Sequence, residues 1–155
     1  SLTPRDTTQG KSMRTVIKPS YSDPPYSLHD AYVVALAAKG DTLHLATQYG
    51  YVRTTEPYGQ VKGDIEITGV DWESSYVYLM EYTDVLCGNC GSFIGRKMTL
   101  PAFLQEFPSF SLDIMDESYG YCQANLTGFL NLNDRLLEFR LELYYTGAFQ
   151  YILKE

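Results

Sequence analysis

The run Cys87-Gly88-Asn89-Cys90-Gly91 is the segment whose residue types and spacing could most directly do chemistry. Gly-Asn is a favourable central pair for a two-residue hairpin turn, so one interpretation places the two cysteines on either side of a turn between strands. The C-x-x-C spacing is also that of half a zinc ribbon, in which two thiolates face one metal ion. A redox-active thiol pair is the third interpretation.

The rest of the chain favours the hairpin turn. A structural zinc ion needs four ligands, and without a second C-x-x-C they would have to come from Cys122 and from His29 or His44, in distant segments. A thioredoxin-type pair needs a helix N-terminus to lower the thiol pKa, whereas residues 92–100 are predicted to form a strand. We therefore expect free thiols and neither a metal nor a cofactor, and we keep the disulfide and the zinc site as alternatives.

His29 and Asp30 are the next candidates, because histidine is the commonest general base and an acidic neighbour could orient it. Adjacent residues on a strand point to opposite faces, so the two side chains are not expected to pair. The chain has no G-x-S-x-G nucleophile elbow for a base to serve. We interpret the pair as structural, where a loop enters a strand. A hydrolase or other small-molecule enzyme, with a site assembled from His29, Asp30, His44 and the cysteines, is the alternative function.

The sequence gives little support for calcium binding or for nucleotide binding. Asp113, Asp116 and Glu117 lie close in sequence, but calcium loops need a denser set of oxygen donors, so solvated strand ends are expected here. Neither the phosphate-binding loop G-x-x-x-x-G-K-[ST] nor the dinucleotide turn G-x-G-x-x-G occurs. The sequence therefore gives no sign of nucleotide chemistry.

Aromatic residues are abundant, with 14 Tyr, 7 Phe and 1 Trp. Aromatic side chains on strands can line a ligand cavity or form a protein-binding face, although tyrosine also commonly packs its ring in the core. Trp72 lies in a polar segment between Asp71 and Glu73, and it precedes the tyrosine-rich segment 76–82. We predict Trp72, Tyr76 and Tyr78 as binding residues.

Alternating apolar and polar residues predict most of the elements that must position these groups. The clearest strand is 136–145, in which Leu137, Phe139, Leu141 and Leu143 share one face. Segment 76–82 is apolar or aromatic on both faces, which is typical of a central strand. Further strands are expected at residues 64–67, 92–100, 110–114, 122–127 and 148–153.

Helix is indicated at two places. Segment 28–38 is ambiguous, because Ser27 and Asp30 mimic a helix capping box, whereas the turn around Gly40 leads straight into residues 42–47; we favour a hairpin. A short helix should begin after Thr99 as its N-cap and end before Pro108. The predicted fold class is mainly β, an antiparallel sandwich or barrel with one short helix.

Length and composition limit the organisation and the partners. We expect residues 1–12 to be a flexible leader that is in part not native, followed by a single β-rich domain over 13–155. The net charge of -7 disfavours nucleic acid and anionic membranes as partners and suits a basic protein. The absence of a membrane-length apolar run or a secretory pattern, together with an odd number of cysteines, favours the cytoplasm.

The runs Ser27-Leu28-His29-Asp30-Ala31 and Gly69-Val70-Asp71-Trp72 resemble small uncharacterised bacterial proteins, some of them immunity-type proteins that neutralise a partner toxin. The resemblance covers about the first half of the domain and brings no catalytic residues with it. It implies a bacterial, cytosolic, non-enzymatic protein-binding domain. The preferred hypothesis is accordingly a non-catalytic binding module with a protein partner.

Overall fold

Most of the chain is β-strand in the computed structural model, which describes residues 12–86 and 90–154. Within these residues, ten strands form one antiparallel sheet and three short strands form a second sheet. The large sheet has the spatial order β1 (Met13–Ile17), β13 (Phe149–Lys154), β7 (Gly63–Ile67), β4 (Thr42–Thr47), β3 (Tyr32–Lys39), β10 (Ser111–Gly120), β11 (Gln123–Asn131), β12 (Leu136–Tyr144), β8 (Tyr76–Leu86) and β9 (Cys90–Thr99). The small sheet contains β2 (Tyr26–Ser27), β5 (Tyr51–Arg53) and β6 (Gly59–Val61).

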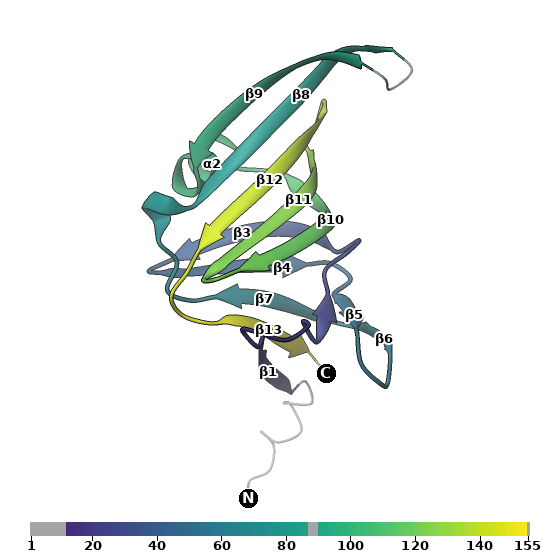
Figure 1. Cartoon of the computed structure of the whole chain (residues 1–155), viewed down its shortest axis with the longest axis vertical. Coiled ribbons are helices and arrows are strands. Elements are labelled where there is room, and N and C mark those ends of the chain that lie inside the picture. Colours follow the sequence, from purple (N-terminus) through teal and green to yellow (C-terminus); the bar gives the residue numbers. More distant parts are fainter. Residues whose placement is uncertain (1–11, 87–89, 155) are drawn as a thin grey trace, which may run out of the picture.

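The large sheet is strongly twisted and open (Figure 1). Its strand order begins with β1 and ends with β9, which lie at opposite ends and do not pair with each other. The predicted mainly β, antiparallel class with one short helix is confirmed. Of the two architectures predicted, the closed barrel is wrong, and the arrangement is sandwich-like.

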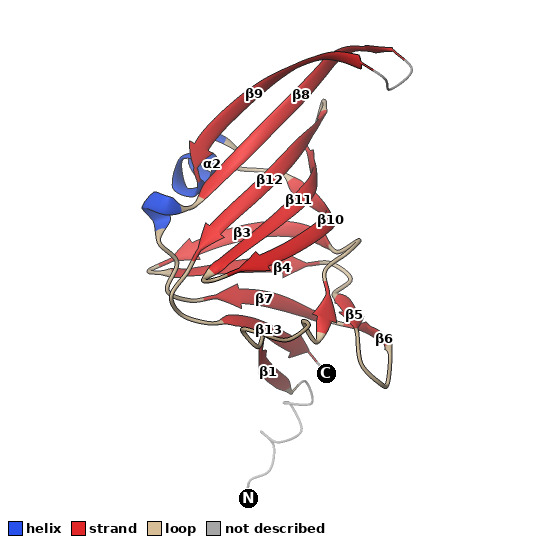
Figure 2. Ribbon diagram, viewed as in Figure 1, coloured by secondary structure: helices blue, strands red, loops and turns tan. Residues whose placement is uncertain are grey.

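The helical parts are short (Figure 2). The helix α2 (Leu100–Glu106) follows β9 as predicted, and the Thr99 hydroxyl accepts a hydrogen bond from the Ala102 N–H at 3.3 Å. Leu100 and Phe103 are buried, so α2 covers part of the apolar face of β8 and β9. A single 3₁₀ turn, η1 (Trp72–Ser74), precedes β8. No helix in the described residues is long and apolar enough to cross a membrane.

The core lies on one face of the large sheet, and β12 shows the alternation that builds it. Leu137, Phe139, Leu141 and Leu143 are all buried, as the period-two pattern predicts, while the intervening residues are not. The other predicted alternations also bury their apolar residues, but Asp64 of β7, on the face predicted to be polar, is buried as well. Buried residues from them are Ile65, Ile67, Leu112, Ile114, Ala124 and Leu126.

Segment 28–38 forms a hairpin and no helix. The strands β3 and β4 pair with Lys39 opposite Thr42, and Gly40 in the turn between them has a φ of 61°. Glycine adopts this left-handed conformation without a steric penalty because it has no Cβ, so Gly40 suits the hairpin turn. Helix propensity at the Ala-rich positions is outweighed by the pairing of β3 with β4, and β10 pairs with the start of β3 at Tyr32 and Val33.

Two other predictions need correction. The strand β8 is next to the edge, and only Val77 and Leu79 of its described residues face the core; Tyr76, Tyr78 and Met80 are half-buried on the other face, and Tyr82 is exposed. Tyrosine suits either environment, so its presence alone does not show whether a strand face is buried. Residue Cys122 belongs to the turn before β11 and not to the strand.

The hairpin predicted around the two cysteines is present as β8 and β9. Its register pairs Leu86 with Cys90. Residues 87–89 lie outside the described residues, so the predicted Gly88-Asn89 turn and the state of the thiols stay predictions. Most of the predicted leader, residues 1–11, lies outside them as well.

The buried face of β12 can be tested by replacing leucine with alanine at one buried and one exposed position. Leu141→Ala removes a side chain that is 1% exposed and should lower the free energy of unfolding by about 2 to 5 kcal/mol. Leu136→Ala, on the same strand at 57% exposure, should change it by less than about 1 kcal/mol. Urea denaturation measures both. Equal losses would contradict the assigned face.

A close backbone approach at Gly128 gives a second test. Gly128 lies opposite the bulge in β10, where the register shifts between Ile114 and Asp116, and a Cβ there would overlap the Asp113 carbonyl oxygen. Gly128→Ala should therefore destabilise the protein by about 1 to 3 kcal/mol. Gly95→Ala on β9 is the control, since its Cβ would meet nothing closer than 3.6 Å. A neutral Gly128→Ala in thermal unfolding would show that the bulge yields easily.

Candidate functional site

The three residues predicted to bind a partner lie in two different settings. Trp72, in η1, donates its indole N–H to the Gly40 carbonyl oxygen at 2.8 Å and packs against the core. It therefore fastens η1 to the β3–β4 hairpin. Tyr76 and Tyr78 share the outer face of β8, where the Lys97 ammonium lies 4.2 Å from the first ring centroid and 5.5 Å from the second.

The face that carries these two tyrosines continues as an exposed aromatic patch along the hairpin. Tyr82 of β8 pairs with Phe93 of β9, and their ring centroids are 5.6 Å apart. Met80 lies half-buried one row below, between Gly95 on β9 and Glu138 on β12. Leu136, two residues before Glu138, is exposed on the same face. We call this patch the outer surface: Tyr76, Tyr78, Met80, Tyr82, Phe93 and Leu136.

The strand β9 forms the edge of the sheet beside this patch. Within the described residues it pairs only with β8, so its other side presents a row of backbone N–H and C=O groups. Phe93 is 59% exposed on the outer surface, and Ile94 is 66% exposed on the opposite face. An edge strand with exposed apolar side chains on both faces is a ready template for pairing with another chain.

His29 and Asp30 pair with each other, contrary to the prediction. The His29 Nδ1 atom lies 3.3 Å from Asp30 Oδ1, and both side chains are exposed. The two residues form a turn and not part of a strand, because Asp30 has a φ of 69°. The Asp30 N–H donates to the Ile114 carbonyl oxygen at 2.7 Å, which joins the backbone of this turn to β10.

His44 lies elsewhere, on the outer face of β4 beside β7. Its Nε2 atom is 3.0 Å from Asp64 Oδ2, and its Nδ1 atom is 3.2 Å from Glu66 Oε2. A neutral imidazole has one N–H and can donate to one of these carboxylates, whereas the doubly protonated ring can donate to both. No contact joins His44 to His29, Asp30 or Cys122 in the described part of the chain. The four-group enzyme site is thus not brought together there.

Asp64 is the best-connected carboxylate of the His44 cluster. It is buried, and its Oδ1 accepts from the Thr47 N–H at 3.0 Å while the Lys154 ammonium lies 3.0 Å from Oδ2. Burial by itself would raise the Asp64 pKa, but the hydrogen bonds from Thr47, Lys154 and His44 outweigh it and hold the pKa below its ordinary value of 3.8. Asp64 is therefore ionised and engaged at neutral pH.

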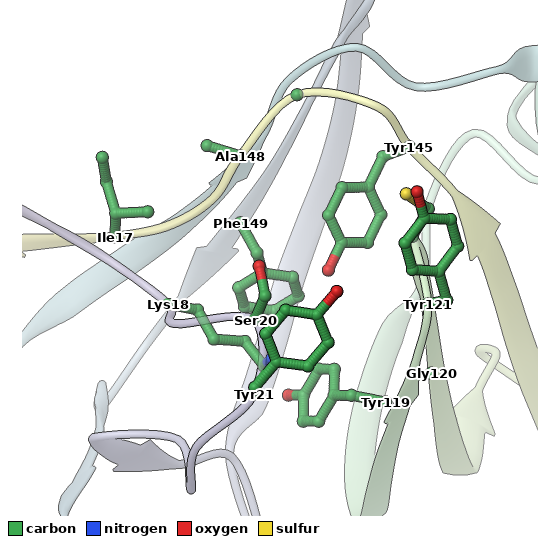
Figure 3. Close-up of a pocket in the computed structure, with 12 residues that line it drawn as sticks. Ile17, Lys18, Ser20, Tyr21, Tyr119, Gly120, Tyr121, Tyr145, Ala148 and Phe149 are labelled. Carbon is green, nitrogen blue, oxygen red and sulfur yellow. The ribbon is translucent and has the colours of Figure 1, made fainter.

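Another group of polar and aromatic side chains lines a pocket where the segment after β1 meets two turns (Figure 3). A cavity of about 380 Å³ opens between the segment 17–21, the β10–β11 turn at 119–122 and the connection into β13 at 145–149. Its walls are largely aromatic. They include Tyr21, Tyr119, Tyr121, Tyr145 and Phe149.

Lys18 and Glu117 set the electrostatics at the base of this pocket. Lys18 is only 9% exposed, and its ammonium lies 4.2 Å from the centroid of the Tyr119 ring. Burial lowers the Lys18 pKa, and the nearby Glu117 carboxylate opposes that shift. Burial also raises the pKa of the Tyr119 hydroxyl, which donates to Glu117 Oε1 at 2.6 Å. Tyr119 therefore contacts the Lys18 ammonium through its ring face and the Glu117 carboxylate through its hydroxyl.

Sequence reasoning missed this pocket. The sequence predicts a solvated strand end at Glu117 and gives no signal at Lys18. The two residues are far apart in the chain and carry no motif. The abundance of tyrosine was the available signal, but it did not show which tyrosines would meet.

Comparisons with known proteins give no family to anchor these sites: no protein-family model, no curated protein and no solved structure matches the chain. Among the described residues, no group of three or more His, Cys, Asp or Glu side chains is placed to hold a metal ion. The geometry of the outer surface, the β9 edge and the tyrosine-lined pocket therefore carries the functional argument.

The depressed pKa of Asp64 predicts an acid-dependent contribution to stability. Its ionised form is favoured in the folded state, so the contribution is complete above about pH 5 and is lost as the pH falls through 3.8 towards the folded-state pKa. Asp64→Asn should lower the free energy of unfolding by about 1 to 3 kcal/mol at pH 7. The difference in free energy of unfolding between this variant and the unmodified protein should become smaller below about pH 4.

Urea denaturation from pH 3 to pH 7 measures this gap, with Asp134→Asn at an exposed loop position as the control. The control should show no such narrowing. A gap for Asp64→Asn that stays constant with pH would mean that the carboxylate charge contributes nothing.

Proposed function

We propose that this chain is a non-catalytic protein-binding module whose binding element is the β8–β9 hairpin. The observation that carries the proposal is the edge position of β9, which pairs only with β8 among the described residues and has Phe93 and Ile94 exposed on its two faces. Folded proteins usually protect such edges with charges, proline, bulges or a covering segment. In Figure 1 the far end of this hairpin reaches beyond the neighbouring strands.

The partner that suits this edge is an extended protein segment. Such a segment would add to β9 as a further strand, with its backbone N–H and C=O groups bonded to those of the edge. Its alternate side chains would meet Phe93 on one face and Ile94 on the other. The tyrosines of the outer surface would extend the contact on the Phe93 side.

Charge would contribute more to the attraction of the partner protein than to its contact with the β9 edge. The nearby basic residues are largely compensated: Arg96 makes two 2.7 Å contacts to Glu106, and Arg140 lies 2.9 Å from Glu142. The whole chain carries a net charge of -7, which would attract a basic protein at long range. A basic protein would be attracted by the net charge, and an apolar strand of that protein could contact the β9 edge.

The resemblance to immunity-type proteins fits this proposal. In that setting the chain would be a bacterial, cytoplasmic inhibitor that neutralises a basic partner by binding it. No catalytic group is needed for such a role, and the outer surface requires no cofactor.

Site-specific photocrosslinking in cells of the source organism tests the proposal. With p-benzoylphenylalanine in place of Phe93, irradiation should give a discrete adduct to one protein, because a partner strand on β9 would lie against this side chain. Adding Ile94→Lys to that chain should reduce the adduct at least about tenfold, since a charge on the edge opposes strand addition.

The photoreactive residue at Tyr58 is the matched control. Tyr58 is at least as exposed as Phe93, at 68%. It lies just before β6, which is a strand of the second sheet. It should not give the same adduct. The same protein captured from both positions, or no adduct from Phe93, would overturn the proposal. Unchanged thermal unfolding of Ile94→Lys shows that its effect is not a loss of folding.

A further inference from the structure

The tyrosine-lined pocket is not needed for binding at β9, and its walls have a composition of their own. Aromatic rings come to it from three separate chain segments, and Figure 3 shows the hydroxyls of Tyr21 and Tyr145 pointing towards one another across the opening. Neither hydroxyl has a hydrogen-bond partner within the described part of the chain. A volume of about 380 Å³ lies within the range of small-molecule sites, roughly 300 to 1,000 Å³.

The charge of the pocket wall is positive although the chain as a whole is acidic. Among the described residues that line the cavity, Lys18 is the one charged residue, and no acidic residue is present. The Glu117 carboxylate is behind the wall. Its Oε1 accepts from the Tyr119 hydroxyl and its Oε2 accepts from the Leu28 N–H, each at 2.6 Å.

The Lys18 ammonium has hydrogen-bonding capacity left over. It has three donors, and the described structure gives it one acceptor, the Pro19 carbonyl oxygen at 3.1 Å. The face of the Tyr119 ring, 4.2 Å away, attracts the charge without accepting a directed bond. Lys18 as a whole residue is only 9% exposed, and its side chain lines the pocket. An oxygen acceptor with a negative charge is what this position lacks.

We propose that the pocket binds a small aromatic carboxylate. The carboxylate accepts hydrogen bonds from the Lys18 ammonium, and the ring packs among the tyrosine side chains, with Tyr21 closing one side. A free aromatic acid and the carboxyl terminus of a peptide that ends in an aromatic residue share this chemistry. A cationic ligand is disfavoured, because the lysine already occupies the aromatic floor.

Nuclear magnetic resonance titration of the full chain tests the site with matched probes. Naphthalene-2-carboxylate should bind saturably at least about tenfold more tightly than naphthalene-2-carboxamide, since only the acid offers a charged acceptor. The shifted amide signals should belong to residues 17–21, 119–122 and 145–149. Acid and amide binding equally, or shifts confined to other residues, would overturn the proposal.

A second arm distinguishes the two sources of the ligand. Acetyl-Gly-Gly-Phe with a free terminal carboxylate is compared with its terminal amide. Tighter binding of this peptide than of the naphthoate, with the same preference for the acid, assigns the site to a chain terminus. Binding of the naphthoate alone assigns it to a free aromatic acid. Failure of both acids to bind at millimolar concentration refutes the inference.

Two variants locate the interaction, each with a control. Lys18→Met keeps the length of the side chain and should abolish the preference for acid over amide, whereas Lys39→Met at the exposed end of β3 should keep it. Tyr21→Ala, at a position that is 89% exposed and so dispensable for folding, should weaken both probes severalfold; Tyr58→Ala should not. A Lys18→Met protein that retains the preference, or a Tyr21→Ala protein with unchanged affinities, would contradict the assignment.

Discussion

The open sheet has one apolar face, and the rest of the structure depends on covering that face. Strand β12 shows the constraint most clearly, because Leu137, Phe139, Leu141 and Leu143 must all lie on the covered side while Glu138, Arg140 and Glu142 face outward. A slip of one residue in register would reverse both sets. The helix α2 and the second sheet contribute to this cover, and Phe103 and Tyr51 are among the largest fully buried side chains they contribute.

An open sheet also leaves features that a barrel would not have. A closed barrel has no strand edges, whereas here β1 and β9 are both outermost. At the β9 end, the outer face bears the tyrosines and Phe93, which are partly or largely exposed. The same lack of closure that leaves β9 at an edge therefore creates the surface to which we assign protein binding.

The opposite end of the molecule is organised by tyrosines and a few charges. The rings of Tyr26, Tyr51 and Tyr151 lie in mutual contact, with centroids 4.8 to 5.6 Å apart. Burial raises the pKa values of the Tyr51 and Tyr151 hydroxyls, so both stay neutral. Tyr51 donates to the Asp64 carbonyl oxygen at 2.8 Å. Next to this cluster, Lys18 lies over the ring of Tyr119, and Glu117 accepts a hydrogen bond from its hydroxyl. These two residues give the tyrosine-lined pocket a charged base.

The sequence by itself determined the elements whose information is local. Alternation in β12, the cap at Thr99 with the stop before Pro108, and the turn at Gly40 are each encoded within a few residues, so the strands, the helix and the hairpin could be predicted. Only the tertiary structure decided which strands lie at the edges, because strand order depends on contacts between distant segments. It alone placed Tyr76 and Tyr78 on a half-exposed face and Trp72 against a hairpin. It also brought Lys18 beside Tyr119, since neither residue carries a local pattern that names its partner.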